Sequence, residues 1–234
     1  MNLKKIILIS RPRFWIYELG TFLFGVLAGA NIQQNIFDPI ILIYGFYFLL
    51  PANILIYGIN DIYDYETDKL NPKKNLYEEL LTPTEHKHIW RSIAITTIPF
   101  IFTSLFIPKS AFLFFCIFIF FAVFYSAKPI RAKTKPFFDS FFSAGHYIAT
   151  GIFGYYLHGG GAFPYEGVLA GMLWAIAMHA YSAVPDIHAD SEAKMQTIAT
   201  KLGGLKTLIL CMFLYLGSAI FAYKILGITG ALCG

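Results

Sequence analysis

Residues 39–68 read PIILIYGFYFLLPANILIYGINDIYDYETD, an apolar run that ends in a series of acidic side chains. A helix of about 20 apolar residues crosses the hydrocarbon core of a bilayer, and residues 39–59 supply that length. Asp61, Asp64 and Asp68 follow at spacings of i, i+3 and i+7, so their carboxylates share one face of a helix. This stretch predicts a membrane helix that carries a chemical site at its end.

The composition of the whole chain extends this interpretation. Of its 234 residues, 57% are hydrophobic and 14% are charged, whereas soluble domains carry about 25% charged residues. These values argue against a cytosolic globular domain, a disordered chain and a nucleic-acid-binding protein. We therefore expect an all-α, polytopic membrane helix bundle of about seven transmembrane helices, forming one domain over residues 1–234. The expected spans are residues 14–30, 39–59, 89–107, 111–126, 137–157, 163–185 and 205–228.

The basic residues indicate the orientation of these spans. Sixteen of the 18 Lys and Arg residues precede the first span or lie between spans two and three, four and five, or six and seven. Only Lys109 and Lys224 fall on the other side. Because short loops rich in Lys and Arg face the cytoplasm, we expect an integral membrane protein with a cytoplasmic N-terminus. Most of the acidic residues share that face and require another explanation.

A second acidic series follows span six. Asp186 and Asp190 are spaced i, i+4, and His179 and Ser182 are predicted to continue their stripe toward the membrane. Spans two and six run in the same direction, so both series are expected to emerge on the cytoplasmic side. A single charged residue at a helix end is usually a solvated cap. Two acidic series on one side, each continuing into a polar stripe, favour a functional site.

Clustered carboxylates need a cation nearby. Like charges on one helix face repel one another, and unpaired acids near a bilayer are costly. Carboxylate oxygens without cysteine suit Mg²⁺, which takes one or two protein carboxylates and completes its shell with water and substrate phosphate. The sequence thus predicts an active site with Mg²⁺ around a diphosphate. Its predicted metal ligands are Asp61, Asp64, Asp68, Asp186 and Asp190, all but Asp68 being predicted catalytic residues as well.

Basic and polar side chains supply the rest of this predicted site. Lys and Arg both bind phosphate, Arg with bidentate geometry. The predicted diphosphate-binding residues are Lys73, Lys74, Lys128, Arg131 and Lys133. The predicted substrate-binding residues, which extend the two acidic faces toward the membrane, are Asn53, Tyr57, Asn60 and His179. Asn53 serves equally well in a hydrogen bond to another helix.

Three motifs, in this order and spacing, are typical of one enzyme family. Residues 60–68 match the pattern NDxxDxxxD at every fixed position, and residues 125–133 follow the pattern YSxxPxRxK. A DxxxD motif followed by threonine is present at Asp186, Asp190 and Thr197. With these motifs the chain resembles the UbiA superfamily of intramembrane prenyltransferases.

Shorter stretches resemble one branch of that superfamily, the lycopene elongases that make C50 carotenoids. They are SRPRFW at 10–15, LPAN at 50–53, NPKK at 71–74, MHAYSAVPDI at 178–187 and TIAT at 197–200. The resemblance implies Mg²⁺-dependent transfer of a prenyl group from an allylic diphosphate, with dimethylallyl diphosphate as donor and lycopene as the lipophilic acceptor. The cation left after transfer must lose a proton or gain water. Candidates to accept that proton are His179, His146 and Asp64.

The chain departs from the family pattern at two residues and in its number of helices. Ser191 stands where this branch often has Arg, and Lys194 stands where Gly is common in the second motif. The superfamily usually has nine helices, so a count of seven leads us to expect a shortened member or a truncated chain. The sequence does not indicate an oligomeric state.

Two other functions stay open at this point. One is a prenyltransferase of the same superfamily with an aromatic quinone precursor or a lipid as acceptor. The other, from a different class, is a carboxylate-lined cation transporter. A transporter places its acids near the bilayer midplane, whereas these acids lie at the ends of the predicted helices, which favours the enzyme.

Overall fold

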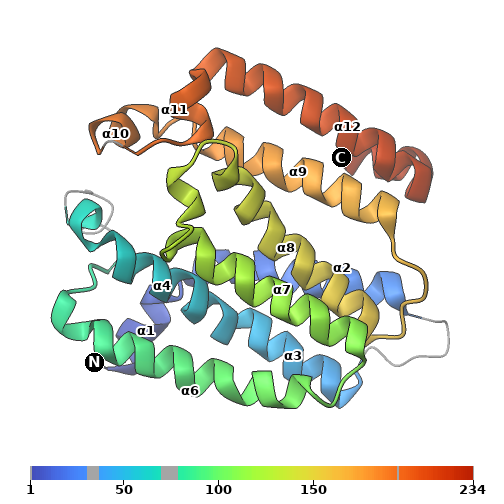
Figure 1. Cartoon of the computed structure of the whole chain (residues 1–234). Coiled ribbons are helices and arrows are strands. Elements are labelled where there is room, and N and C mark those ends of the chain that lie inside the picture. Colours follow the sequence, from blue (N-terminus) through green and yellow to red (C-terminus); the bar gives the residue numbers. More distant parts are fainter. Residues whose placement is uncertain (1, 31–36, 70–78, 194, 234) are drawn as a thin grey trace. The chain divides into compact units, whose positions relative to one another are not determined.

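The computed structural model describes residues 2–30, 37–69, 79–193 and 195–233, which form helices, with no strand among them (Figure 1). The all-α prediction is therefore confirmed. The chain groups into two compact units. The first comprises residues 1–127 and 149–161, and the second comprises residues 128–148 and 162–234.

Most of the described helices belong to the first unit. They are α1 (Leu3–Ile9), η1 (Pro12–Phe14), α2 (Trp15–Gly29), α3 (Pro39–Leu49), α4 (Pro51–Asp68), η2 (Pro83–Glu85), α6 (His86–Ser104) and α7 (Lys109–Ser126). The helix α8 (Phe138–Leu157) begins in the second unit and ends in the first. The other elements of the second unit are η3 (Ala132–Thr134), α9 (Tyr165–Ser182), α10 (Ile187–Glu192), α11 (Ile198–Leu202) and α12 (Gly204–Cys233).

Each of the seven expected apolar segments coincides with a helix or a pair of helices. Within the described ranges, three stretches are long and apolar enough to cross a membrane: Pro39–Asp68, Lys109–Ser126 and Gly204–Leu232. The other four segments coincide with α2, α6, α8 and α9, which are shorter or carry more polar groups. The count of seven spans stays a prediction.

The second expected span is divided into α3 and α4 at Pro51. Proline has no N–H to donate, so the last carbonyl groups of α3 need other donors. The side-chain amide of Asn53 supplies them, because its Nδ2 lies 3.0 Å from the carbonyl oxygens of both Phe48 and Leu49. Asn53, a predicted substrate-binding residue, is 1% exposed and its amide N–H groups hold this junction together.

An aromatic core fixes the helices of the first unit. The Phe22 and Phe48 rings stack with centroids 5.2 Å apart, and the Tyr44 and Phe153 rings lie 4.8 Å apart. Phe115 of α7 packs 5.8 Å from Tyr44. These side chains are buried, and each aromatic pair adds about 0.5–1.5 kcal/mol beyond the burial of its area. The core thus joins α2, α3, α7 and the end of α8.

The helices α2 and α8 approach each other through glycine. A Cβ atom at Gly25 would lie 1.8 Å from the carbonyl oxygen of Gly151, and one at Gly154 would lie 2.4 Å from that of Phe22. One turn further, a Cβ at Gly29 would lie 2.3 Å from the oxygen of Tyr155. Small residues allow such backbone contact between membrane helices. The spacing Gly25-xxx-Gly29 is therefore required by packing.

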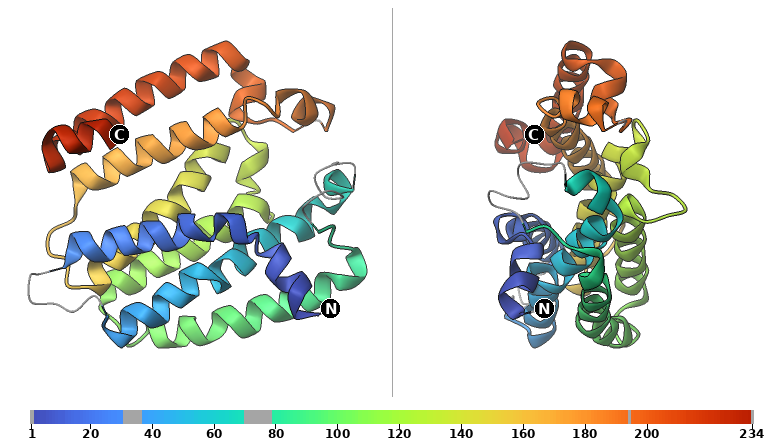
Figure 2. Two further views of the ribbon diagram at one scale, coloured as in Figure 1. Left: turned by 180° about the vertical axis from the view of Figure 1, so that it is seen from behind. Right: turned by 90° about the vertical axis from the view of Figure 1, so that its left-hand side faces the viewer.

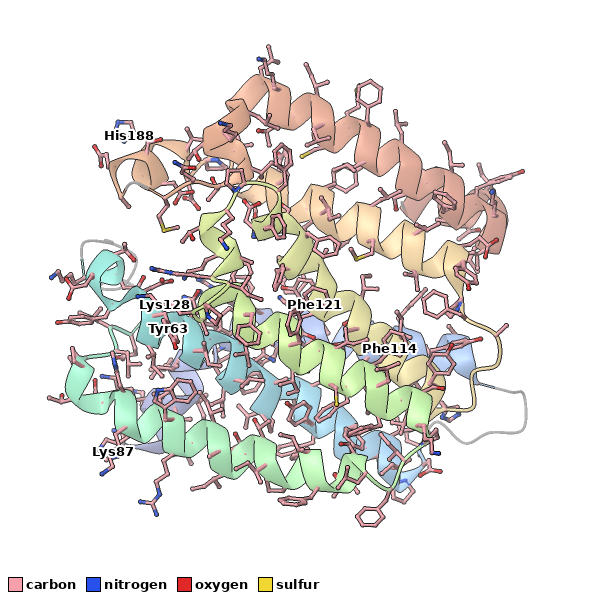
Figure 3. The ribbon with its side chains drawn as sticks, viewed as in Figure 1. Tyr63, Lys87, Phe114, Phe121, Lys128 and His188 are labelled. Atoms are coloured by element: carbon pink, nitrogen blue, oxygen red, sulfur yellow. The ribbon has the colours of Figure 1, made fainter. Side chains whose placement is uncertain are left out.

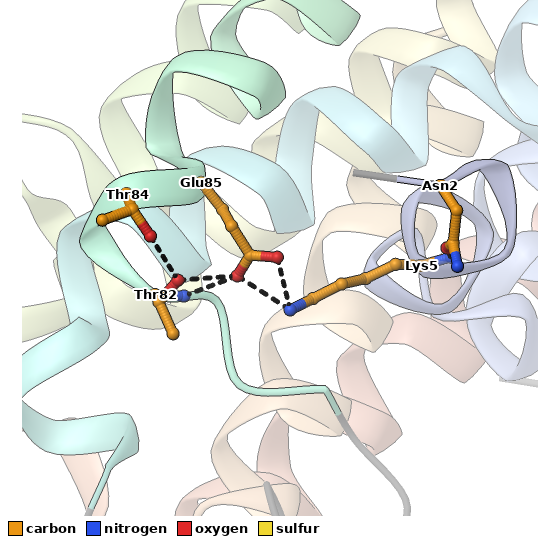
Figure 4. Close-up of polar contacts among 5 residues, drawn as sticks. All are labelled: Asn2, Lys5, Thr82, Thr84 and Glu85. Atoms are coloured by element: carbon orange, nitrogen blue, oxygen red, sulfur yellow. Dashed lines mark hydrogen bonds and ion pairs between the residues drawn. The ribbon is translucent and has the colours of Figure 1, made fainter.

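The start of the chain is tied to the beginning of α6 by an ion pair (Figure 4). Lys5 Nζ lies 2.7 Å from Glu85 Oε1 and 2.8 Å from Oε2. Glu85 Oε2 also accepts hydrogen bonds from the backbone N–H and the hydroxyl of Thr82. Burial raises the pKa of Glu85, but the hydrogen bonds from Lys5 and Thr82 together lower it by more. The resulting pKa is about 2, below the ordinary value of 4.5.

We expect this ion pair to make stability depend on pH. Since the pKa of Glu85 is lowered on folding, its contribution is present above pH 4.5 and is lost as the pH falls toward 2. Replacing Lys5 by Met should cost about 1 kcal/mol at pH 7, after screening by solvent. Thermal unfolding in detergent at pH 7 and pH 3 measures this. The exposed neighbour Lys4 is the control: a Lys4→Met loss equal to that of Lys5→Met would contradict the assignment.

In the second unit, α9 and α12 pack side by side (Figure 2). Ser218 Oγ donates to the carbonyl oxygen of Ala170 at 2.9 Å, and Cys211 Sγ contacts that of Ala177 at 3.4 Å. Small residues at these positions let the two backbones approach. α12 bends at Gly227, whose φ of 61° lies in the left-handed region. The contact between α9 and α12 thus forms the buried core of the second unit.

Candidate functional site

The first acidic series lies on one continuous helix, as predicted. α4 extends without a break from Pro51 to Asp68. Asp61 is 2% exposed and Asp64 is 7% exposed, whereas Asp68 in the last turn is half-buried. Burying two carboxylates is costly unless cations and hydrogen bonds accompany them. This end of α4 therefore requires a positively charged partner for its carboxylates.

Arg11 supplies a cation to this cluster. Its Nη2 donates to Asp61 Oδ1 at 3.0 Å, and its guanidinium lies 4.6 Å from the centre of the Tyr57 ring. The backbone of Arg11 is left-handed, with φ 51°, at the turn between α1 and η1. Phe14 packs on the other side of this turn, 5.8 Å from Tyr57. Arg11 thus fixes the buried carboxylate and covers a predicted substrate-binding residue.

Arg11 was not among the residues predicted for the site. Its charge was counted only toward orientation, and it lies 50 positions before Asp61 in the chain. The signal in the sequence that points to Arg11 is the cluster of acids itself: buried carboxylates need a cation, and an arginine of the preceding basic segment meets that need as well as Mg²⁺ does.

Asn60 connects the first series to the end of α7. Its Oδ1 accepts a hydrogen bond from Ser126 Oγ at 3.1 Å, and its Nδ2 lies 3.5 Å from Asp61 Oδ1. Ser126 is buried and belongs to the YSxxPxRxK stretch. Two of the three motifs therefore meet through a side-chain contact. Tyr63 projects from the same part of α4 (Figure 3).

The three predicted diphosphate-binding residues within the stretch 125–133 differ in how exposed they are. Lys128 is exposed (Figure 3). Arg131 is half-buried with a left-handed φ of 45°, and Lys133 in η3 is only 5% exposed. A lysine so enclosed is uncommon in proteins, and Lys133 is the most buried of the three. Lys73 and Lys74 lie outside the described residues.

The second acidic series is organised differently from the prediction. The helix α9 ends at Ser182, and Asp186 precedes the short helix α10. The continuous stripe from His179 and Ser182 to the aspartates is therefore wrong. The residue before Pro185 is biased away from helical geometry and proline cannot donate a helical hydrogen bond, which explains the break. Asp190 N still donates to Asp186 O at 2.8 Å, so the two aspartates are one turn apart.

The two histidines considered as proton acceptors lie on helices of the second unit. His179 Nδ1 lies 3.0 Å from Ser140 Oγ of α8, and its ring is therefore oriented by that hydroxyl. His146 is 4% exposed, with the ring of Tyr147 at 4.2 Å. Both are interior groups, and their part in proton transfer stays a prediction.

The donor set suits Mg²⁺ better than a softer metal. Within the described residues, no three His, Cys, Asp or Glu side chains are grouped closely enough to enclose a metal ion by themselves. Mg²⁺ does not require such a cage, because it binds through one or two carboxylates and takes its other ligands from water and phosphate. Each series offers carboxylate oxygens without a thiolate. Mg²⁺ held jointly with a phosphorylated substrate fits these residues.

Comparison with known sequences finds a matching family profile and similar proteins that agree with it. The profile of the UbiA prenyltransferase family matches residues 19–233. The chain is 37% identical over 211 residues to the lycopene elongase/hydratase of Haloarcula japonica, covering 90% of this chain and 71% of the relative. It is 38% identical over 215 residues to that of Halobacterium salinarum, covering 92% and 77%. The Corynebacterium glutamicum lycopene elongase/hydratase is 32% identical over 223 residues, covering 94% and 76%.

Solved structures share the fold. A UbiA homolog from Archaeoglobus fulgidus bound to GPP and Mg²⁺ matches with a TM-score of 0.83 at 20% identity, covering 98% of this chain and 85% of that one. A UbiA homolog from Archaeoglobus fulgidus bound to DMAPP and Mg²⁺ matches with a TM-score of 0.81 at 19% identity, covering 94% of this chain and 77% of that one.

Proposed function

The chain belongs to the UbiA prenyltransferase family, an integral membrane family, and on this premise we propose that it is a lycopene elongase. It transfers a prenyl group from dimethylallyl diphosphate to lycopene in an Mg²⁺-dependent step of C50 carotenoid synthesis. One observation carries the proposal: α4 takes the carboxylates of Asp61 and Asp64 into the protein interior at the end of an apolar helix. Sequence identity to relatives named lycopene elongase/hydratase supports the choice of acceptor.

The acidic residues hold the metal in this proposal. Its ligands would be Asp61, Asp64, Asp68, Asp186 and Asp190. When bound, Mg²⁺ would stabilise the negative charge that develops on the departing diphosphate. Arg11 keeps Asp61 oriented, and Ser126 keeps Asn60 beside it. These contacts prepare the ligands before substrate arrives, which is the condition for strong electrostatic stabilisation.

The basic residues hold the diphosphate in this proposal. Lys128, Arg131 and Lys133, with Lys73 and Lys74, would balance its charge. The prenyl chain extends from there into the apolar bundle, which excludes water from the allylic cation. The ring face of Tyr57, over which the Arg11 guanidinium lies, is an aromatic surface that would stabilise such a cation.

We also propose that the active site faces the cytoplasm of a bacterial or archaeal cell. The orientation rests on the distribution of Lys and Arg among the loops. The kind of cell rests on the archaeal and bacterial relatives. A cysteine introduced at the exposed Lys128 tests the orientation: a membrane-impermeant maleimide should label that cysteine only after the cells are opened.

Pigment analysis tests the proposed acceptor. Expression of the chain in a lycopene-producing host should convert lycopene to carotenoids that are longer by one or two prenyl units, detected by chromatography and mass spectrometry. Expression of the Asp64→Asn variant should leave lycopene unchanged.

Two other results would change the proposed acceptor or the proposed class of protein. Unchanged lycopene together with prenylation of an added aromatic or lipid acceptor would replace lycopene by that acceptor. Cation flux in vesicles without any prenyl diphosphate would favour a transporter instead.

A further inference from the structure

A third buried aspartate, outside both acidic series, lies in the second unit. Asp139, in the first turn of α8, is 0% exposed. Its Oδ2 accepts a hydrogen bond from the backbone N–H of Ile198 at 2.7 Å, across 59 positions of the chain. Its Oδ1 is also enclosed and accepts no hydrogen bond from the described residues. A fully buried carboxylate is costly to retain, so its single long-range bond calls for an explanation.

That hydrogen bond ends next to the second acidic series. Ile198 is the first residue of α11, whose N-cap is Thr197. Thr197 Oγ1 lies 3.3 Å from Asp190 Oδ2 and can donate to it. A continuous chain of contacts therefore runs from Asp139 through the start of α11 to a predicted metal ligand.

The start of α11 needs this external support. α11 spans only Ile198–Leu202, and isolated helices of that length do not form in water. The reciprocal bonds of Thr197 and Thr200 satisfy two of its backbone N–H groups, whereas that of Ile198 points to Asp139. The bond from Ile198 N–H to Asp139 Oδ2, at 2.7 Å, is shorter than the local ones, at 2.8 and 3.3 Å, and both of its atoms are buried. Asp139 thus fixes where Thr197 stands.

We propose that Asp139 is a positioning residue for the metal site: it anchors α11 so that Thr197 orients the carboxylate of Asp190. This proposal rests on the proposed function, in which Asp190 is a metal ligand. Partners that orient metal ligands typically change metal affinity by 10–100-fold when removed, about 10-fold being the expected lower bound here. The role is distinct from catalysis, because Asp139 would act only through other residues.

Metal affinity measured in the presence of inorganic diphosphate tests the proposal, because the diphosphate supplies the phosphate ligands that the carboxylates do not. The full chain in detergent is titrated with Mn²⁺, and bound metal is followed by the loss of the free Mn²⁺ signal in electron paramagnetic resonance. A titration of diphosphate without protein is subtracted. Asp139→Ala should weaken Mn²⁺ binding about 10-fold or more. Asp139→Asn should bind within about twofold of wild type, because its side-chain oxygen still accepts from Ile198 N–H. Equal affinity in Asp139→Ala and wild type, or equal loss in Asn and Ala, would overturn the proposal.

Two further comparisons guard against general destabilisation. Ser218→Ala removes another buried side-chain-to-backbone bond of the same unit and should leave Mn²⁺ binding unchanged. If Asp139→Ala does not fold, Thr197→Ser and Thr197→Val decide: the serine should bind Mn²⁺ normally and the valine about 10-fold more weakly, and equal binding by the two would overturn the proposal.

Failure of the proposed function gives a different result. Wild-type protein that binds no Mn²⁺, and prenyl transfer that is insensitive to EDTA, would overturn the metal site itself. Normal Mn²⁺ binding by wild type with no effect of Asp139→Ala would overturn only the positioning role.

Discussion

Replacing Asp61 or Asp64 by alanine is expected to lower prenyl transfer at least about 10³-fold while the protein still inserts into membranes. Both side chains are buried at the end of α4, where a metal-bound diphosphate is proposed to develop charge. Asp186→Ala is expected to have the same effect from the second series. Transfer is measured in isolated membranes with dimethylallyl diphosphate and lycopene, with and without EDTA.

The same helix offers a matched control. The side chain of Glu66 is 77% exposed and forms an ion pair with Lys69 of the next turn. Glu66→Ala should therefore retain normal transfer. Asp61→Asn keeps the size of the side chain and a hydrogen-bond acceptor for Arg11, so its loss of activity would report on charge and not on packing. Normal turnover by Asp61→Ala and Asp64→Ala would contradict the proposed metal site.

Replacing Gly25 by alanine is expected to cost about 3 kcal/mol of stability, at the upper end of overpacking effects. The added Cβ would lie 1.8 Å from the carbonyl oxygen of Gly151, and a backbone atom cannot move aside as the end of a side chain can. The helices α2 and α8 would have to separate, which opens the aromatic core around Phe22. Thermal unfolding in detergent measures the loss.

Gly20 provides the comparison for this substitution. It lies on α2 as well, but a Cβ there would meet no atom within 4 Å. Gly20→Ala should therefore leave stability unchanged or raise it by up to about 1 kcal/mol, because alanine favours helix. If both variants unfold at the same temperature, the close approach of α2 and α8 does not limit stability.

The amino-acid sequence alone determined the class of fold and the position of the first series. Apolar length and helical spacing are local properties, so the helices around residues 14–30 and 111–126, and the face shared by Asp61, Asp64 and Asp68, followed from them. The motifs indicated the family for the same reason, since each is a short pattern. The approximate limits of the helices were also predictable, because each apolar run is flanked by polar residues.

Only the tertiary structure showed how the side chains pair. The bonds from Arg11 to Asp61, from Ser126 to Asn60 and from Ile198 to Asp139 join residues far apart in the chain, and no local pattern encodes them. It also showed that the Asn53 side chain stabilises the helix break at Pro51, and that α9 ends before Asp186. Spacing fixes which residues share a face. Which partner satisfies a buried charge depends on how the helices pack, because burial and distance set the energy of each contact.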